Sequence, residues 1–431
     1  MRVNDTQARK SCNLHACLRH SMRFARWTGF FPVQGLNQLT ADGTKFKVQC
    51  FYGIYNILTL MGQSVLLYFT FHNFFNSEVS LSSVSYVLFY VVNFTAAISL
   101  VRLAKCWPKL MKLAEETEQS LTLLKLDGHT IKKSNIIAIV MIVTSLVTHS
   151  LSTIFIVKLT IECVSNTTST YLSNEIFESY VKIRMFFIFN HVPYSELKAI
   201  SAMIFHLQTT ILTCYVDVLT ICCSIYITSY FYNLNKIIYS RKNNSAISWG
   251  QLREHYSKLA LLVKEIDAQL SSFTLLSFFG DIYFICLQLF TILHKSIANF
   301  KFKNCDAVKS NSMLASPEYI IAYYSAFLFL MLRFISLSLF AANVHNIAQK
   351  PVIPVYSVQP EEYDQEVERF QLILRFTTVA FSGKLFYVTR NTILQAISTI
   401  ITYELVLLQF SKTYLEDDSV NNTTSVVDNW D

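Results

Sequence analysis

Apolar residues in this chain occur in long, nearly uninterrupted stretches, without the alternation that is typical of half-buried strands. About 20 apolar residues are enough to cross the roughly 30 Å hydrocarbon core of a bilayer as a helix. Stretches of this length occur at 48–77, 79–101, 134–157, 199–235, 268–294, 319–349 and 391–411. Because backbone amides inside a bilayer must be satisfied within their own segment, the pattern predicts an all-α polytopic membrane protein with seven transmembrane helices.

Charged residues are rare within these predicted spans. The first three spans contain none, and each of the other four contains one: Asp217, Asp281, Arg333 or Glu404. A charge inside a bilayer is costly unless it faces water or a partner. Arg333 is the basic residue among the four, so we expect it to pair with Glu404; otherwise Glu404 accepts hydrogen bonds from hydroxyls or is protonated.

Composition and charge distribution support a membrane protein and give its orientation. Of 431 residues, 52% are apolar and only 15% are charged, with a mean hydropathy of +0.35, whereas a typical soluble domain is about 25% charged. If the N-terminus is cytoplasmic, 26 of the 36 Lys and Arg residues lie in inner segments and 9 in outer segments. Basic residues are retained on the cytoplasmic side during insertion, so we predict a cytoplasmic N-terminus and an extracellular C-terminus.

The segments outside the spans differ in character. Residues 1–47 form a basic cytoplasmic arm, and residues 412–431 form a polar extracellular tail after the transmembrane domain, 48–411. Apolar residues at helical spacing indicate that the inner segments prolong the membrane helices and pack together beneath the bilayer. These inner segments are 102–133, 236–267 and 350–390.

Two of the ten cysteines lie in predicted outer loops: Cys163 in 158–198 and Cys305 in 295–318. Disulfides persist in the oxidising exterior, so these two residues either form a bridge or remain free thiols. The sequon at Asn166 lies in the same outer loop, and we predict glycosylation there. The chain shows no metal-site spacing, phosphate-binding loop or nucleophile constellation, so no metal, cofactor, nucleic acid partner or enzymatic activity is expected.

The last predicted span has one polar face. At 100° per residue, Gln395, Thr399, Thr402, Val406 and Gln409 fall within an arc of about 80°. Glu404 lies on the opposite side of the helix, and Phe410 borders the arc near its outer end. Such a stripe suits either the lining of a water-filled path formed by several copies or interhelical hydrogen bonds within one bundle. In the first case, Phe410 could close the path by dewetting.

Three segments carry a family resemblance. "TYELVLLQF" at 402–410 resembles the signature of insect gustatory receptors, and with "FSGKLFYVTR" and "FPVQGL" it is similar to the sugar-sensing branch. The resemblance implies a ligand-gated, non-selective cation channel in the plasma membrane of gustatory receptor neurons. It also implies four identical or sister subunits around a pore lined by the last helix, with Gln409 and Phe410 at the outer gate. Thr402, Tyr403 and Glu404 would form the structural start of the signature.

A sugar site needs amides or carboxylates for hydroxyl groups and aromatic rings for C–H faces. With the predicted orientation, the outer halves of the spans offer both kinds of group. The candidate ligand-binding residues are Tyr86, Tyr90, His149, His206, Gln208, Asp281, Tyr283, Gln288, Tyr323 and Tyr324. The expected function is sugar detection in sweet taste, with a non-sugar tastant as an alternative ligand.

Other classes of membrane protein remain as alternatives. A G-protein-coupled or other metabotropic chemoreceptor would carry no ion flux of its own, and the G-protein-coupled class would place the N-terminus outside. A secondary transporter is usually built from internal repeats, and none is visible in this chain.

Overall fold

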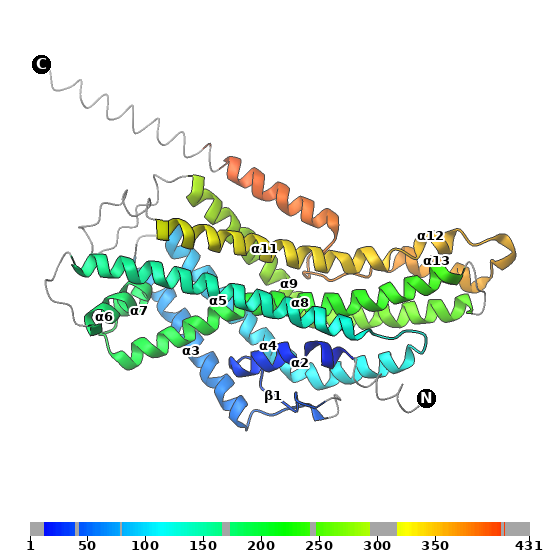
Figure 1. Ribbon diagram of the computed structural model, residues 1–431, viewed down its shortest axis with the longest axis horizontal. Coiled ribbons are helices and arrows are strands. Elements are labelled where there is room, and N and C mark those ends of the chain that lie inside the picture. The colour runs from blue at the N-terminus through cyan, green and yellow to red at the C-terminus, as the bar shows by residue number, and fades with distance from the viewer. Residues whose placement is uncertain are drawn as a thin grey trace, which may run out of the picture.

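The structure, a computed structural model, is almost entirely helical (Figure 1). It describes residues 13–38, 43–77, 80–165, 173–241, 247–293, 317–406 and 409. The named strands in this part are short: β1 (Val33–Gln34) and β2 (Lys45–Phe46) form one antiparallel pair, with Val33 opposite Phe46. The expected helical class is therefore confirmed.

Six described helices are long and apolar enough to cross a membrane. They are α3 (Phe51–Asn76), α4 (Leu81–Ser120), α5 (Gly128–Ser165), α8 (Glu196–Ser240), α9 (Trp249–Leu293) and α11 (Pro317–Ala348). Each corresponds to one of the first six predicted spans. The seventh predicted span is described as a helix over 390–406. Because 407–408 and 410–431 lie outside the described part, the count of seven spans stays a prediction.

Helix α8 is the centre of the bundle. It contacts α2 (Leu14–Trp27), α6 (Ser173–Arg184) and five of the long helices, α3, α4, α5, α9 and α11. Of the residues in its most apolar stretch, 83% are buried, compared with 11% in α5. A helix that is apolar all round can be enclosed by others. Any charge at its middle, such as Asp217, therefore lies inside the bundle.

The two ends of the bundle are built differently (Figure 1). Helices α6 and α7 (Phe186–Phe189) lie at one end, which we call the α7 end. Helix α12 (Val352–Tyr356), the 3-10 turn η3 (Pro360–Glu362) and α13 (Gln365–Phe376) lie at the other, which we call the α13 end. At 1.5 Å per residue, the 45 residues of α8 span about 68 Å, far more than a bilayer requires. Helices α4, α8 and α9 thus extend well beyond a membrane.

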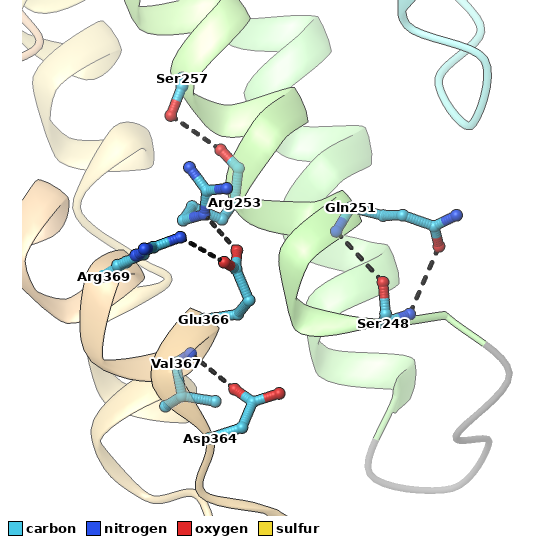
Figure 2. Close-up of polar contacts among 8 residues, drawn as sticks. All are labelled: Ser248, Gln251, Arg253, Ser257, Asp364, Glu366, Val367 and Arg369. Atoms are coloured by element: carbon cyan, nitrogen blue, oxygen red, sulfur yellow. Dashed lines mark hydrogen bonds and ion pairs between the residues drawn. The ribbon is translucent and has the colours of Figure 1, made fainter.

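Helix α13 is fixed to α9 by one shared carboxylate. Arg253 Nε donates to Glu366 Oε2 over 2.7 Å, and Arg369 Nη1 donates to Glu366 Oε1 over 2.9 Å (Figure 2). The hydrogen bond from Arg253 lowers the pKa of the Glu366 carboxyl. Asp364 caps the start of α13 by accepting from the Val367 backbone N–H at 2.9 Å. The segment between α13 and the last helix therefore begins at a fixed position relative to α9.

A small hairpin, residues 381–388, follows α13 and precedes the last helix; we call it the linker hairpin. Val388 N donates to Phe381 O, and Gly383 N donates to Phe386 O, both over 2.8 Å. Asp267 of α9 accepts from Ser382 N at 2.7 Å and from Ser382 Oγ at 2.6 Å. The linker hairpin is thus attached to α9 immediately before the last helix begins.

The basic arm contains an amphipathic helix, α2, packed against α4, α5 and α8. Its N-cap, Asn13, accepts from the Ala16 backbone N–H at 2.7 Å. Glu118 Oε1 of α4 accepts from the Leu14 backbone N–H at 2.8 Å and from the Tyr226 hydroxyl of α8. These contacts attach the start of the arm to the central helix.

The arm reverses direction at Gly29, whose φ is +86°. A Cβ atom at this position would lie 2.3 Å from Thr59 Oγ1. Gly29 O also accepts from Asn56 Nδ2 at 2.7 Å. A side chain is excluded both by the backbone conformation and by the close approach of α3.

The reactivity of Cys17 toward a thiol reagent tests whether α2 of the arm is packed against the bundle. Cys17 of α2 is fully buried, and burial raises the pKa of its thiol to about 12. Because the thiolate is the reactive species, Cys17 is almost entirely unreactive at pH 7.5. We expect N-ethylmaleimide to modify the exposed Cys106 in the folded protein and to modify Cys17 only after denaturation. Peptide mass spectrometry measures both, and equal modification of the two residues before denaturation would contradict the packing of α2.

The predicted outer segment 158–198 is largely helical. Helix α5 continues to Ser165, and α6 and α7 occupy most of the rest. Hydropathy did not indicate α6 because this helix has a polar surface and no long apolar run. Its buried residues Tyr180 and Val181 nevertheless join the aromatic cluster around Phe187 at the α7 end.

Several predicted features lie outside the described residues. These are the Cys305 and Cys163 side chains, the Asn166 sequon, Phe410, which was expected at the outer gate, and the tail 412–431.

Candidate functional site

Four of the candidate ligand residues, including His206 itself, gather at the α7 end around this residue of α8. The Tyr90 hydroxyl lies 2.9 Å from His206 Nδ1, and Arg184 Nη2 lies 3.2 Å from His206 Nε2. The ring of His149 lies 6.0 Å from the ring of His206. Tyr90 and His206 are 2% and 8% exposed. We call Tyr86, Tyr90, His149, Arg184 and His206 the His206 cluster.

The hydrogen-bonding groups of Arg184, His206 and Tyr90 determine which atoms donate and which accept within the His206 cluster. Arginine has only donors, so His206 Nε2 must accept from Arg184. The proton of the neutral imidazole is then on Nδ1, which donates to the Tyr90 oxygen. The Tyr90 hydroxyl hydrogen is left without an acceptor among the described residues. A buried donor of this kind suits a ligand hydroxyl group.

Aromatic rings surround this polar centre. Tyr86 lies edge-on to Phe186, with ring centres 5.3 Å apart, and the Tyr90 and Phe187 ring centres are 5.5 Å apart. Phe89 lies 6.1 Å from His206 and 6.4 Å from Phe284 of α9. The cluster therefore combines polar groups with ring faces, as sugar recognition requires.

A second contact brings another candidate ligand residue, Tyr283 of α9, next to the α4 residue that precedes Tyr86. The Tyr283 hydroxyl lies 3.0 Å from Ser85 Oγ of α4. Because α9 also holds the linker hairpin through Asp267, one helix connects the His206 cluster with the start of the last helix.

The other candidate ligand residues lie elsewhere. Gln208 Nε2 donates to the Tyr55 hydroxyl of α3 over 3.0 Å. The Tyr323 hydroxyl donates to the Gln288 backbone carbonyl over 3.0 Å, and Tyr324 is 44% exposed. Gln288, Tyr323 and Tyr324 thus form a separate group on α9 and α11, away from the described contacts of the His206 cluster.

Arg184 was not among the sequence candidates. It lies at the end of α6, within the segment that was expected to be a loop. The available signal was the helical spacing of Tyr180, Val181 and Arg184, which places two buried residues and the arginine on one side of a short helix.

Arg333 pairs with two aspartates and not with Glu404, which corrects the expected ion pair. Its Nη2 donates to Asp281 Oδ1, and its Nε lies 2.8 Å from Asp217 Oδ2 without hydrogen-bond geometry. Both aspartates are 0% exposed. The reason is topological: α11 packs against α8 and α9, which carry the two carboxylates.

Asp281 was expected to contact the ligand. It is 0% exposed and its Oδ1 accepts from Arg333, whereas its Oδ2 has no hydrogen-bond partner among the described residues. Asp281 lies two residues before Tyr283 on α9, and its contact with a sugar stays a prediction.

The last helix packs through a narrow face. Ala396, Ile400 and Glu404 are buried at a spacing of four residues. Both carboxylate oxygens of Glu404 lack a hydrogen-bond partner among the described residues. As expected from the helical angles, Glu404 and the polar stripe lie on opposite sides.

The polar stripe is exposed in the single chain, at Gln395, Thr399, Thr402, Val406 and Gln409. The Thr399 and Thr402 hydroxyls donate to carbonyls of their own helix over 2.9 Å. The Gln395 amide has both donors and acceptor, and burial in lipid would leave these unsatisfied. Tyr403 is also exposed, at the edge of the stripe.

Comparisons with known proteins agree with this architecture. A family model described as "Trehalose receptor" matches residues 1–419. The Drosophila melanogaster protein "Gustatory receptor 5a for trehalose" is 27% identical over 92% of this chain and 85% of its own length. "Gustatory receptor for sugar taste 64f" from the same organism is 24% identical over 92% of this chain and 81% of its own length.

A solved structure shares the fold. The insect olfactory receptor OR5 from Machilis hrabei, in complex with eugenol, has a TM-score of 0.65 and 12% identity, covering 91% of this chain and 97% of that chain. The chain is therefore a multi-pass membrane protein that belongs to the trehalose receptor family, among the gustatory receptors for sugar taste.

Proposed function

We propose that this protein is a sugar-gated, non-selective cation channel that detects sweet taste. The observation that carries the channel mechanism is the polar stripe of the last helix, exposed on the side opposite to the packed face of Ala396, Ile400 and Glu404. An exposed glutamine in a membrane helix needs water or a polar partner. Four identical or sister subunits around a shared axis supply both, with Gln409 and Phe410 at the outer gate.

The proposed ligand site is the His206 cluster. The free hydrogen of the Tyr90 hydroxyl donates to a sugar hydroxyl, and the rings of Tyr86 and Phe89 face its C–H surfaces. Arg184 positions His206 and, with it, Tyr90. The chemistry of a polyol and the sugars named for the relatives support this choice of ligand.

The proposed gating path runs along α9. Ligand bound near Tyr283 favours one position of α9 over another, which shifts the population of open channels. On the same helix, Phe278 packs 5.5 Å from Phe386 of the linker hairpin, and Asp267 holds Ser382. Movement of α9 therefore displaces the linker hairpin and rotates the last helix.

The proposed setting follows from the charge distribution and the family. The N-terminus is cytoplasmic, the C-terminus is extracellular, and the protein resides in the plasma membrane of gustatory receptor neurons. The helix extensions and α13 form a cytoplasmic anchor in which subunits meet.

Substitution of Arg184 tests the ligand site. We expect Arg184→Gln to raise the sugar concentration for half-maximal current by at least about tenfold, since a charge-assisted hydrogen bond contributes about 1.5–3 kcal/mol. Lys182→Gln is the matched control, because Lys182 lies on the same helix but is exposed and pairs with Glu178 at 2.5 Å. Equal effects of the two substitutions, at equal surface expression, would remove Arg184 from the site.

Measurement of sugar-evoked currents tests the proposed function. The receptor is expressed alone in a non-neuronal cell line, and currents are measured in excised patches against a panel of mono- and disaccharides. A sugar-evoked current in an excised patch supports a channel. A response that needs soluble cytosolic components supports a metabotropic receptor, and a current evoked only by other tastants supports the non-sugar alternative.

A further inference from the structure

Exposed basic side chains form a patch where the arm meets the membrane helices. Lys45 and Lys47 lie on and beside β2, and Arg102, Lys105 and Lys109 lie on one side of α4; all five are exposed. Arg23 of α2 is half-buried. Helix α4 contacts both β2 and α2. We call these six residues the basic patch.

The basic patch has no ion-pair partner in the part of the chain that the structure describes. None of its six residues forms an ion pair in the described part. Asp42 is the only acidic residue between Asn13 and Ser77, and α4 has none before Glu115. The patch therefore presents several positive charges that attract an anion.

The position of the patch matches a membrane surface. Lys45 and Lys47 directly precede α3, the first membrane-spanning helix, and Arg102 directly follows the apolar run of α4. Trp27 is 68% exposed and Phe51 is 77% exposed beside the same elements. Exposed aromatic rings next to basic residues are typical of the level of lipid headgroups.

We propose that the basic patch binds the headgroups of anionic phospholipids in the cytoplasmic leaflet. Charge complementarity selects this occupant, because the inner leaflet carries negative lipids and attracts basic clusters beside membrane helices. The inference rests on the cytoplasmic N-terminus of the proposed orientation. It goes beyond sugar gating, because it assigns a second ligand class to a different surface.

The effect of lipid binding is transmitted to the core of the receptor through the arm. Arg23 lies on α2, whose first residue is held by Glu118 together with Tyr226 of the central helix. Lipid binding therefore stabilises the packed position of α2 against α8.

The test compares two variants with the same change in net charge. Lys45→Gln with Lys47→Gln removes two patch charges, and Lys236→Gln with Lys264→Gln removes two exposed charges from the extensions of α8 and α9. Purified full-length receptor in neutral detergent is titrated with fluorescent short-chain phosphatidylserine, phosphatidylinositol bisphosphate and phosphatidylcholine. We expect the patch variant to bind the anionic lipids at least about fivefold more weakly and the control to bind within about twofold of wild type. The two anionic lipids show which headgroup is preferred.

Several results would overturn the proposal. These are equal binding by both variants, or binding of phosphatidylcholine as tight as that of the anionic lipids. A change in subunit assembly by size-exclusion chromatography, with unchanged lipid binding, would identify the patch as a contact between copies of the chain. If the patch variant does not fold, wild-type binding is measured between 50 and 300 mM salt. A decrease with salt supports the proposal, and no decrease overturns it.

Discussion

Replacement of Arg333 by methionine is expected to remove at least about nine-tenths of the receptor from the cell surface. The substitution leaves the carboxylates of Asp217 and Asp281 facing each other at the centre of the bundle, both 0% exposed. Removal of one partner from a buried ion pair costs about 3–5 kcal/mol, a large part of the about 5–15 kcal/mol by which a folded domain is stable. Surface biotinylation of the expressed receptor measures the loss.

Substitutions of the two aspartates serve as controls, because each single substitution is expected to preserve surface expression. Because two carboxylates share one guanidinium, Asp217→Asn or Asp281→Asn alone leaves a balanced pair, and surface expression should stay within about twofold of wild type. Both substitutions together leave Arg333 alone and should reduce expression strongly. Combining both with Arg333→Met should restore part of it, because no charge remains. If each single aspartate variant lost as much surface expression as Arg333→Met, the interpretation that one remaining carboxylate balances Arg333 would be contradicted.

The group of Arg333, Asp217 and Asp281 shows what could and could not be predicted from the sequence. The single charges in the later spans were visible as exceptions in apolar runs, and cost alone indicated that they need partners. Which acid pairs with Arg333 depends on which helices are neighbours. Asp217, Asp281 and Glu404 are equivalent candidates until α11 is placed against α8 and α9.

The proposed ligand site leads to a similar conclusion. Tyr90 and His206 could be proposed because both lie in the outer halves of predicted spans and offer suitable groups. Their mutual hydrogen bond could not be predicted, since it depends on how α4 and α8 are rotated about their axes. Arg184 was missed because α6 is short and polar, so hydropathy gives no signal for it.

Helical periodicity, in contrast, was sufficient for the last helix. The angles placed Glu404 opposite the polar stripe, and the structure buries Glu404 and exposes the stripe. Periodicity succeeded here because it depends on one helix and not on the arrangement of several. It does not tell whether the exposed stripe faces water or lipid.

Cysteine substitution distinguishes these two environments. We expect a water-soluble methanethiosulfonate reagent to abolish at least about three-quarters of the sugar-evoked current of Gln395→Cys and Thr399→Cys. Both positions lie on the polar stripe, and a charged adduct inside a narrow aqueous path blocks ions by its volume and its charge. The effect should be faster in the presence of sugar, because an open gate admits the reagent. Whole-cell recording before and after reagent gives both the extent and the rate.

Leu394→Cys is the decisive control, because Leu394 is 64% exposed in the single chain but lies on the apolar flank of the same helix. Exposure alone predicts that it reacts as fast as Thr399→Cys, whereas contact with lipid predicts little reaction, since the thiolate that reacts is disfavoured in hydrocarbon. Ala396→Cys, on the packed face, should also stay unmodified. Fast reaction at Thr399 with slow reaction at Leu394 requires water on one side of the helix and lipid on the other. A last helix that is modified equally all round, or only at Leu394, cannot line a pore, and the channel mechanism would then have to be abandoned.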